Sequence, residues 1–246
     1  MAVHFPDRNP HMTSSPLTSS SGTPLRILIT AGPTWEPIDE VRYLGNRSSG
    51  RLGAQMATAA TRRGLTTTLL RGPATVDPTP DPLLTEGRFQ SASDLESALQ
   101  REWPRHDILI MAAAVADYRP IREKGSPRKI RRTAEPPTIK LAPVPDLLAG
   151  LAEIPHPGTR IGFALEPADE LARNARAKLQ RKGLAGIVAN PLETMEAQTI
   201  DGVFIDADGH EQRPGEGPIE KAAFATWLID RIVDLHHRTS RSTIGD

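Results

Sequence analysis

Short apolar runs alternate with segments of helical periodicity along this chain of 246 residues. The first run, Leu25–Thr30, is closed by Ala-Gly-Pro at 31–33, which is the pattern of a buried strand at its end. Segment 50–63 carries apolar or small residues at helical spacing, and Gly64 ends it. The pattern therefore predicts a strand, a polar connection and then a helix.

The same alternation continues toward the C-terminus. Further strands are predicted at 66–70, 108–111, 138–142, 160–165 and 185–190, and within 202–214 on either side of a turn at Asp208-Gly209. Further helices are predicted at 93–102 with Ser93 as N-cap, at 145–154 with Pro145 in the first turn, at 169–183, and at 218–237. This order favours an α/β, Rossmann-like three-layer fold, in which a mostly parallel sheet carries helices on both faces.

A single domain at 25–238 accounts for all of these elements. The preceding residues, 1–24, are rich in Ser, Thr and Pro, so we expect a disordered tail there and a flexible C-terminus at 239–246. Segment 119–137 is basic and interrupted by prolines, which indicates a mobile flap within the domain.

Composition narrows the class of protein. The 30 basic and 30 acidic side chains cancel, so a large nonspecific footprint for nucleic acid is not expected. No apolar run approaches the roughly 20 residues of a membrane-spanning helix, and the N-terminus lacks the apolar core of a signal peptide. The absence of cysteine removes disulfides, thiolate zinc sites and a cysteine nucleophile. We expect a cytoplasmic protein that binds neither nucleic acid nor a membrane.

The stretch NRSSGRLG at 46–53 leads into the first predicted helix. The first N–H groups of a helix lack internal partners and form the positive end of its dipole, and Ser48 and Ser49 add hydroxyl donors. A phosphate or carboxylate fits such a site; the alternative is an ordinary capped helix with flexible glycines. Because ligands bind beyond the carboxyl ends of parallel strands, a crevice is expected between Gly32–Asn46, Ala112–Tyr118 and Glu166.

Competing motifs are missing from the sequence. The GxGxxG fingerprint does not follow the first strand, which argues against an NAD(P)-binding oxidoreductase. The pattern GxxxxGK[ST] and the GxSxG elbow are absent, and the seven histidines show no spacing of the HExxH type. A metal held by the protein alone is therefore not expected, whereas Mg²⁺ shared with phosphates needs only one or two carboxylates.

Four blocks of sequence resemble phosphopantothenoylcysteine synthetase, which in many bacteria forms the C-terminal half of a bifunctional decarboxylase–synthetase. They are ITAGPTWEPIDEVRYLGNRSSGRLG (29–53), AAAVADYRP (112–120), KIRR (129–132, where the family has KIKK), and GFALEP (162–167) followed by ARAKLQRKGLAGIVAN (175–190). The resemblance extends over about 25–235, nearly the whole predicted domain.

This resemblance implies a ligase of coenzyme A biosynthesis. The carboxylate of 4′-phosphopantothenate attacks the α-phosphate of a nucleoside triphosphate, with CTP favoured and ATP as the alternative, and the amine of L-cysteine then displaces the nucleotide. The resemblance also implies a homodimer, and Mg²⁺ as a cofactor held mainly by the nucleotide phosphates. No flavin is expected in this chain, which lacks the flavin-dependent decarboxylase half, so a separate decarboxylase would act next.

Roles for individual residues follow from the same resemblance. Asn46, Arg42 and Lys129 match catalytic positions: the Asn46 amide would hold the acid and its acyl-phosphate through uncharged donors, and Lys129 matches the lysine of the cysteine-dependent half-reaction. The positions that match substrate or phosphate binding are Gly32, Thr34, Ser48, Ser49 and Gly50. The positions that match nucleotide binding are Ala112, Ala113, Ala114, Asp117, Lys129, Phe163, Lys178 and Lys182.

Several of these residues have an ordinary structural alternative. Arg42 could be a surface arginine in a turn, Asp117 a turn aspartate, and Phe163 a core residue. The basic run around Lys129 could be a solvated charged segment. Glu166 is either structural or a partner of Mg²⁺.

The chain departs from the family pattern in three places. Pro143 and Val144 stand where the family has Lys and Thr or Asn, and GFALEP replaces GFAAET. After Asn190 the chain has PLETMEAQTIDGV, where many members have a longer glycine-containing segment with FxSD. These departures leave the choice between CTP and ATP open. The rival hypothesis is a non-catalytic or differently specific nucleotide-binding Rossmann protein.

Overall fold

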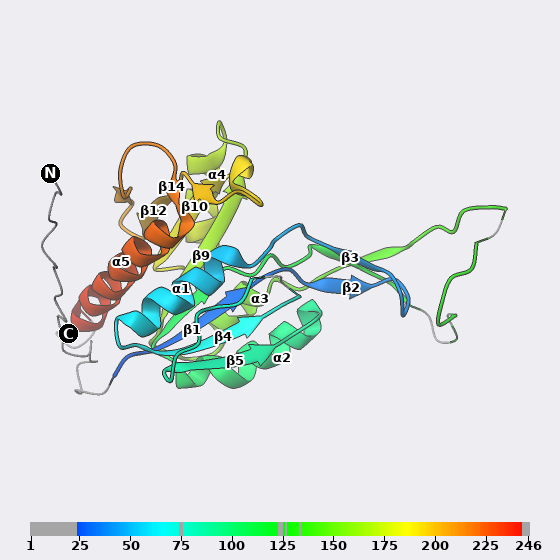
Figure 1. Cartoon of the computed structure of the whole chain (residues 1–246), viewed down its shortest axis with the longest axis horizontal. Helices are drawn as coiled ribbons and strands as arrows, with labels where there is room; N and C mark the ends of the chain where they lie inside the picture. Colours follow the sequence, from blue (N-terminus) through cyan, green and yellow to red (C-terminus); the bar gives the residue numbers. More distant parts are fainter. Residues whose placement is uncertain (1–23, 74–75, 123–124, 126, 133, 243–246) are drawn as a thin grey trace, which may run out of the picture.

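An eight-stranded sheet forms the centre of the computed structural model, with the strand order β13-β12-β10-β9-β6-β1-β4-β5 (Figure 1). The structure describes residues 24–73, 76–122, 125, 127–132 and 134–242. The strands from β10 to β5 in this order run parallel, whereas β12 and β13 run antiparallel to their neighbours. The strands of the sheet are β1 Arg26–Ala31, β4 Thr66–Arg71, β5 Leu84–Arg88, β6 Ile108–Met111, β9 Thr159–Glu166, β10 Gly186–Pro191, β12 Val203–Asp206 and β13 Glu211–Gln212.

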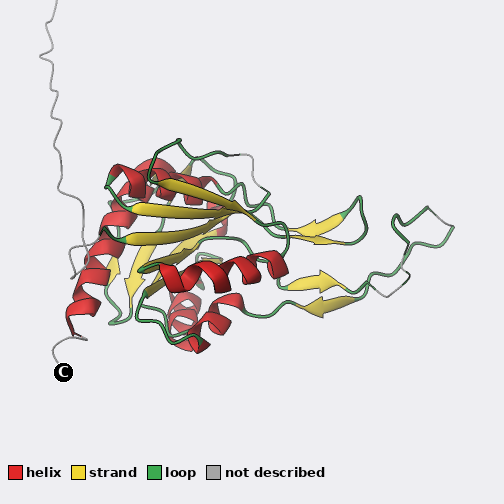
Figure 2. Cartoon of the chain, turned by 90° about the horizontal axis from the view of Figure 1, so that it is seen from below, coloured by secondary structure: helices red, strands yellow, loops and turns green. Residues whose placement is uncertain are grey.

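Helices cover both faces of this sheet (Figure 2). Neighbouring residues of β1 show the two faces: Ile27 and Ile29 pack in one apolar cluster with α1 and α5, whereas Leu28 packs in the other with α2, α3 and α4. The predicted α/β, three-layer architecture is confirmed. The α-helices are α1 Arg51–Arg62, α2 Ala92–Glu102, α3 Leu147–Gly150, α4 Leu171–Arg181 and α5 Lys221–Ser242, and the 3₁₀ helices are Trp103–Arg105, Leu151–Glu153 and Leu192–Thr194.

The order of the strands opens a crevice beside β1. The chain passes from β1 outward to β4 and β5 and then crosses to β6, on the other side of β1. At such a reversal, the connections leave the carboxyl ends of two neighbouring strands in opposite directions, so a ligand can bind between them. The loops after β1 and β6 border this crevice, and a bridge between Pro33 and Ala114 joins them.

Two hairpins extend together away from the sheet and form an arm, which comprises residues 35–45 and the described residues of 118–143 (Figures 1 and 2). The first hairpin pairs β2 Trp35–Pro37 with β3 Tyr43–Gly45, and the second pairs β7 Tyr118–Pro120 with β8 Leu141–Pro143. The described part of the basic segment predicted at 119–137 lies within the second hairpin. A further short pair, β11 Thr199–Ile200 with β14 Ile219–Glu220, leads directly into α5.

The start of α2 differs from the prediction. Ser91, not Ser93, is its N-cap. The Ser91 hydroxyl accepts from the Asp94 N–H at 3.2 Å, and the Asp94 carboxylate accepts from the Ser91 N–H at 2.9 Å. Ser93 also has an acidic residue three positions later, Glu96, so the capping-box pattern alone fits either serine. In the structure Ser93 lies inside the helix, where its carbonyl accepts from the Ser97 hydroxyl at 3.0 Å.

The segment before β9 also differs from the prediction. Asp146 caps α3, which is a single turn from Leu147 to Gly150, so Pro145 lies before the cap instead of in the first turn. The strand predicted at 138–142 is observed at Leu141–Pro143. The strands β2, β3, β5, β7, β11 and β14 were not predicted, and β14 occupies the first residues of the helix predicted at 218–237, which begins at Lys221. The strand β5 (LTEGR) is a polar edge strand, so it lacks the apolar run that marks the inner strands.

Both ends of the chain lie partly outside the described residues. Of the tail predicted at 1–24, the structure describes Pro24 alone. At the other end, α5 continues to Ser242, past the boundary predicted at 238, while residues 243–246 are not described. Throughout the described residues, each helix is too short or too polar to cross a membrane.

Helix α1 approaches the end of β1 so closely that only glycine fits at position 53. A Cβ on Gly53 would lie 2.4 Å from the Cβ of Ala31. We expect Gly53→Ala to displace the start of α1 and to lower the free energy of unfolding by about 1–3 kcal/mol, the usual cost of overpacking. Urea denaturation measures this change.

Gly150→Ala is the matched control for Gly53→Ala. Gly150 has helical backbone angles, φ −59° and ψ −33°, and a Cβ there would meet no atom within 4 Å. The alanine should therefore be neutral or stabilise the protein by about 0.4–1 kcal/mol, because it restricts the unfolded chain. Equal effects of the two substitutions would contradict the proposed steric restriction at Gly53.

Candidate functional site

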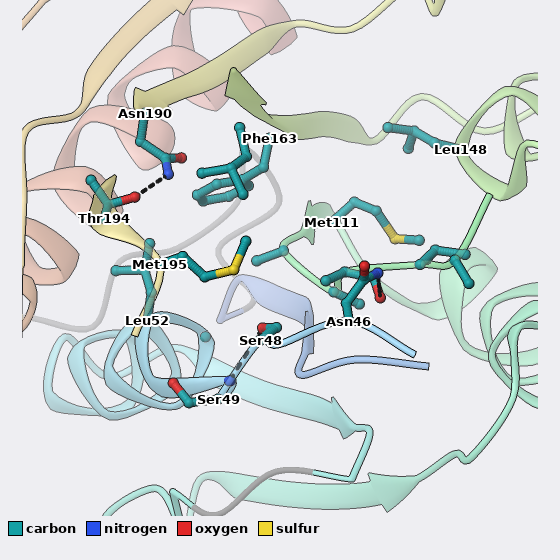
Figure 3. Close-up of a pocket in the computed structure, with 18 of the residues that line it drawn as sticks. Asn46, Ser48, Ser49, Leu52, Met111, Leu148, Phe163, Asn190, Thr194 and Met195 are labelled. Atoms are coloured by element: carbon teal, nitrogen blue, oxygen red, sulfur yellow. Dashed lines mark hydrogen bonds between the residues drawn. The ribbon is translucent and has the colours of Figure 1, made fainter. Parts of the chain in front are cut away.

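A pocket of about 590 Å³ opens at the carboxyl ends of β6, β9 and β10 and beside the start of α1 (Figure 3). The loop after β6, the start of α1, the segment that caps α3, helix α4 and the start of α5 all contribute to its lining. The predicted residues that line it are Asn46, Ser48, Ser49, Gly50, Ala112, Ala113, Ala114, Asp117, Phe163, Glu166, Lys178 and Lys182. The pocket lining does not include Gly32, Thr34, Arg42 or Lys129.

The start of α1 presents free N–H groups to the pocket. Gly50, the N-cap, has φ 67°, a left-handed conformation that glycine adopts without steric cost, and it offers no side chain as a cap. The Ser48 and Ser49 hydroxyls lie 3.4 and 3.5 Å from the N–H nitrogens of Gly50 and Arg51, so they satisfy these donors weakly. An anion can therefore take up the first N–H groups of the helix.

The loop after β6 forms one wall of the pocket, and hydrogen bonds from the loop after β1 hold it in place. Thr34 is fully buried; its Oγ1 accepts from the Ala116 N–H at 3.0 Å, and its N–H donates to the Ala114 carbonyl at 3.1 Å. The Gly32 carbonyl accepts from the Ala114 N–H at 2.9 Å. Gly32 and Thr34 thus support the wall from behind instead of facing the pocket.

Asn46 joins this wall to the loop that precedes α1. Its Nδ2 donates to the Ala114 carbonyl at 2.9 Å (Figure 3). The side chain is exposed and lines the pocket, so one Nδ2 hydrogen is committed to the wall while the remaining polar groups of the amide are accessible to a ligand. Of the crevice predicted between Gly32–Asn46, Ala112–Tyr118 and Glu166, the structure brings Asn46, residues 112–117 and Glu166 to the pocket.

Two lysines of α4 lie one turn apart and both reach the pocket. Lys178 Nζ donates to the Phe163 carbonyl at 2.6 Å, and burial, followed by the charge of Lys182, lowers the pKa of Lys178. Lys182 Nζ forms an ion pair with Asp146 at 2.9 Å. Although burial alone would raise it, this contact and the Ala149 N–H hold the pKa of Asp146 below its usual range.

The opposite end of the pocket is lined by polar residues that the sequence analysis did not select. Asn190 and Thr194 are both buried, and the Asn190 Nδ2 donates to the Thr194 Oγ1 at 2.7 Å (Figure 3). Lys221, the first residue of α5, is also buried, and its Nζ donates to the Thr194 carbonyl at 2.8 Å. The last helix was predicted to begin at residue 218, so the sequence did not mark Lys221 as its first residue, where a cation opposes the helix dipole.

Arg42 and Lys129 belong to the arm. Arg42 donates through Nε to Asp39 at 3.1 Å and through a terminal nitrogen to the Ile130 carbonyl at 2.6 Å. The Glu40 N–H donates to the Arg128 carbonyl at 2.9 Å, so contacts on both sides of Lys129 hold its backbone against the first hairpin. The Lys129 side chain itself is exposed.

Asp39 is the buried centre of this contact between the two hairpins. Its carboxylate accepts from the N–H groups of Ile130 at 3.0 Å and of Val41 and Arg42 at 2.8 Å each. The Ile130 N–H makes the largest contribution, and together with the Arg42 guanidinium these donors hold the pKa of Asp39 well below its usual range. The carboxylate of Asp39 therefore stabilises the arm only in its ionised form.

Asp39→Asn should lower stability at neutral pH more than in acid. Because the folded-state pKa of Asp39 is depressed, its contribution is fully present above the unfolded value of about 3.9 and is lost as the pH falls below that value. The difference in free energy of unfolding between wild type and variant should therefore shrink from pH 7 to pH 3 in urea titrations. Glu40→Gln, at an exposed neighbour, is the control and should show little effect; an Asp39→Asn difference that is independent of pH would contradict the assignment.

The carboxylates of the pocket could hold Mg²⁺ only together with a bound phosphate compound. Asp117 lines the pocket and is exposed, whereas Glu166 accepts a hydrogen bond from Asn174 at 3.0 Å. One or two carboxylates suffice for an Mg²⁺ ion that is held mainly by phosphates. Among the described residues, a group of three side chains with metal-ligating atoms close together lies at the β12–β13 turn, outside the pocket, and comprises Asp206, Asp208 and His210.

A family model and several curated proteins match most of this chain. Residues 23–235 match the family model of the DNA/pantothenate metabolism flavoprotein C-terminal domain. The chain is 42% identical over 229 residues to the coenzyme A biosynthesis bifunctional protein CoaBC of Escherichia coli strain K12, a match that covers 88% of the chain and 53% of that protein. It is 38% identical over 223 residues to CoaBC of Mycobacterium tuberculosis strain H37Rv, covering 85% of the chain and 52% of that protein.

The fold is similar to a solved structure as well. The DNA/pantothenate metabolism flavoprotein of Streptococcus pneumoniae superposes with a TM-score of 0.73 at 26% identity, covering 85% of this chain and 98% of that one. The chain spans about half the length of the curated CoaBC relatives that it matches.

Proposed function

We propose that this chain, which belongs to the family of the DNA/pantothenate metabolism flavoprotein C-terminal domain, is a phosphopantothenate–cysteine ligase of coenzyme A biosynthesis. The observation that carries the proposal is the pocket in which the uncapped start of α1 and the Asn46 amide face the backbone wall at 112–116. Such a site offers neutral donors, the Asn46 amide and the first N–H groups of α1, to an acid and to its acyl-phosphate.

The reaction has two steps at this pocket. A carboxylate oxygen of 4′-phosphopantothenate attacks the α-phosphate of the nucleoside triphosphate, which forms an acyl-nucleotide and releases diphosphate. The amine of L-cysteine then attacks the acyl carbon, the bond to the nucleotide breaks, and the amide and a nucleoside monophosphate form after loss of a proton from nitrogen. The product would then be consumed by a decarboxylase.

Each group of pocket residues has a part in this scheme. Asn46 orients the acid through its amide, and the N–H groups at the start of α1, with Ser48 and Ser49, bind phosphate oxygens. The small side chains of Ala112–Ala114 let the nucleoside lie against the backbone wall. Phe163, Lys178 and Lys182 border the same space and supply an apolar face and two cations for the nucleotide.

Mg²⁺ fits this arrangement as a companion of the nucleotide. Asp117 offers an exposed carboxylate at the pocket, and the phosphates would supply the remaining anionic ligands. When bound, the ion would neutralise part of the charge on the triphosphate.

A homodimer is the proposed assembly, and the arm is its proposed interface. Exposed apolar side chains gather on both hairpins, and an apolar patch of this kind marks an interaction surface. They are Val41, Tyr43, Leu44, Tyr118, Ile121, Ile139 and Leu141, exposed by 39–61%. Sedimentation of the wild type against a variant with Val41 and Tyr118 changed to Ser tests the interface, and a monomeric wild type would contradict it.

An assay of amide formation tests the function. The purified protein is incubated with 4′-phosphopantothenate, L-cysteine and Mg²⁺, with either CTP or ATP, and the amide and diphosphate are quantified. We expect turnover with both substrates present and faster turnover with CTP. Binding of CTP or ATP without turnover would favour the rival hypothesis, a nucleotide-binding protein of another specificity. The altered segment after Asn190 is the reason for considering this rival.

A further inference from the structure

Among the residues that the structure describes, Lys221 is a buried cation without an acidic partner. Its side chain lines the pocket although the residue is only 7% exposed, and its Nζ donates to the Thr194 carbonyl. Within the described part of the chain, no carboxylate forms an ion pair with Lys221, and the charged group that acts on it is another cation, Arg51. Burial of an unpaired charge costs free energy, so a structural role alone explains this residue poorly.

The starts of two helices place Lys221 and Arg51 where positive charge is already high. Arg51 is the first residue of α1 and Lys221 the first of α5, and both line the same pocket. The N-terminal end of a helix carries partial positive charge, so each side chain is unfavourably placed with respect to its own helix. Burial and the nearby Arg51 both lower the pKa of Lys221, in the direction expected for a cation without a counter-ion.

Of the four acidic side chains in the pocket lining, Asp117 lies on the loop after β6, and the other three have partners other than Arg51 and Lys221. Asp146 forms an ion pair with Lys182 at 2.9 Å, and Glu196 forms one with Arg47 at 2.8 Å. Glu166 accepts a hydrogen bond from Asn174, on α4. Lys182 is thus paired by the protein, and Lys178 lies near the charges of Glu166 and Asp146. Among the described residues no acidic side chain forms an ion pair with Arg51 or Lys221, so both are left for a ligand.

We infer that Arg51 and Lys221 together bind a phosphoryl group of one of the two phosphorylated substrates, beside Thr194 and the start of α1. A phosphoryl group carries enough negative charge for both cations and enough oxygens for the N–H groups at the start of α1. The inference rests on the proposed function for the source of this group. It is either the diphosphate part of the nucleoside triphosphate or the phosphate monoester of the acid.

Binding measurements with two probes test the inference without any turnover. The probes are inorganic pyrophosphate and 4′-phosphopantothenate, titrated calorimetrically into wild type and Lys221→Met, with unphosphorylated pantothenate as the comparison. Lys221→Met should weaken at least one probe by about ten- to hundredfold, the loss expected for charge-assisted hydrogen bonds. A loss for pyrophosphate alone identifies the nucleotide as the source, and a loss for 4′-phosphopantothenate alone identifies the acid.

Arg51→Gln is the second variant, and it should weaken the same probe. Lys140→Met on the arm and Arg62→Gln at the other end of α1 remove a charge outside the pocket, so both should bind as the wild type does. Unchanged affinity for both probes in Lys221→Met and Arg51→Gln would overturn the inference, as would a wild type that binds neither probe at millimolar concentration.

The melting temperature of the ligand-free protein separates binding from structural support. Removal of an unpaired buried charge should leave the melting temperature of Lys221→Met unchanged or raised, while the increase caused by the bound probe is lost. A lowered melting temperature with intact binding would mean that Lys221 only supports Thr194. These binding and melting measurements need no amide formation. They can therefore contradict the phosphoryl site while the turnover assay supports the ligase, or support the site while that assay contradicts the ligase.

Discussion

Asn46→Asp should reduce formation of the acyl-nucleotide by roughly 10²- to 10³-fold, the usual cost of losing one well-placed donor at a reacting oxygen. The aspartate would bring a negative charge to the place proposed for the substrate carboxylate, so the two would repel each other. It would also set a carboxylate oxygen against the Ala114 carbonyl, which now accepts from Asn46 at 2.9 Å. Diphosphate release in the absence of cysteine measures this step alone.

Two further variants control the Asn46 result. Asn46→Ala removes the donor without adding charge, so its activity should lie between those of wild type and Asn46→Asp. Gln100→Glu makes the same change from amide to carboxylate at an exposed site on α2, and it should leave the rate unchanged. Acyl-nucleotide formation by Asn46→Asp within threefold of the wild-type rate would remove Asn46 from the proposed mechanism.

Lys129→Gln should have its largest effect on the second step. Since Lys129 matches the lysine of the cysteine-dependent half-reaction, we expect acyl-nucleotide to accumulate and amide formation to slow by roughly 10²-fold, a loss of the size typical for one electrostatic contact to the reacting groups. Mass spectrometry of quenched reactions detects the intermediate directly. Lys140→Gln makes the same substitution at another exposed position on the arm, and it should cause no accumulation.

A mixing experiment tests whether Lys129 acts in the pocket of its own chain or in that of the partner. Lys129 lies on the arm and does not line the pocket of its own chain. If the proposed dimer brings it to the partner's pocket, mixing Asn46→Asp with Lys129→Gln chains restores activity, because one intact pocket then receives one intact lysine. If Lys129 acts in its own chain, each pocket of the mixed dimer has one defect and stays inactive.

Periodicity within short windows was enough to predict most of the sheet. The strand predicted at 108–111 and the helix predicted at 50–63 agree closely with β6 and α1. The apolar pattern of a buried strand or an amphipathic helix lies within one short stretch of sequence, so it can be identified there. The edge strand β5 is mostly polar, so its sequence has no apolar run that would predict a strand. The N-cap of α2 was misplaced because the choice between Ser91 and Ser93 depends on Asp94, whose side chain closes the capping box.

The sequence by itself determined the alternation of strands and helices, the place of the stretch at 46–53 at the start of a helix, and the family through motifs that each lie within a continuous block. The tertiary structure decided which of these residues meet. Thr34 supports the wall instead of lining the pocket, Arg42 contacts a segment 88 residues away, and Lys221 reaches the pocket from the start of the last helix. The physical reason is that burial, charge pairing and hydrogen bonding between distant segments depend on how the layers pack, and no local pattern records that packing.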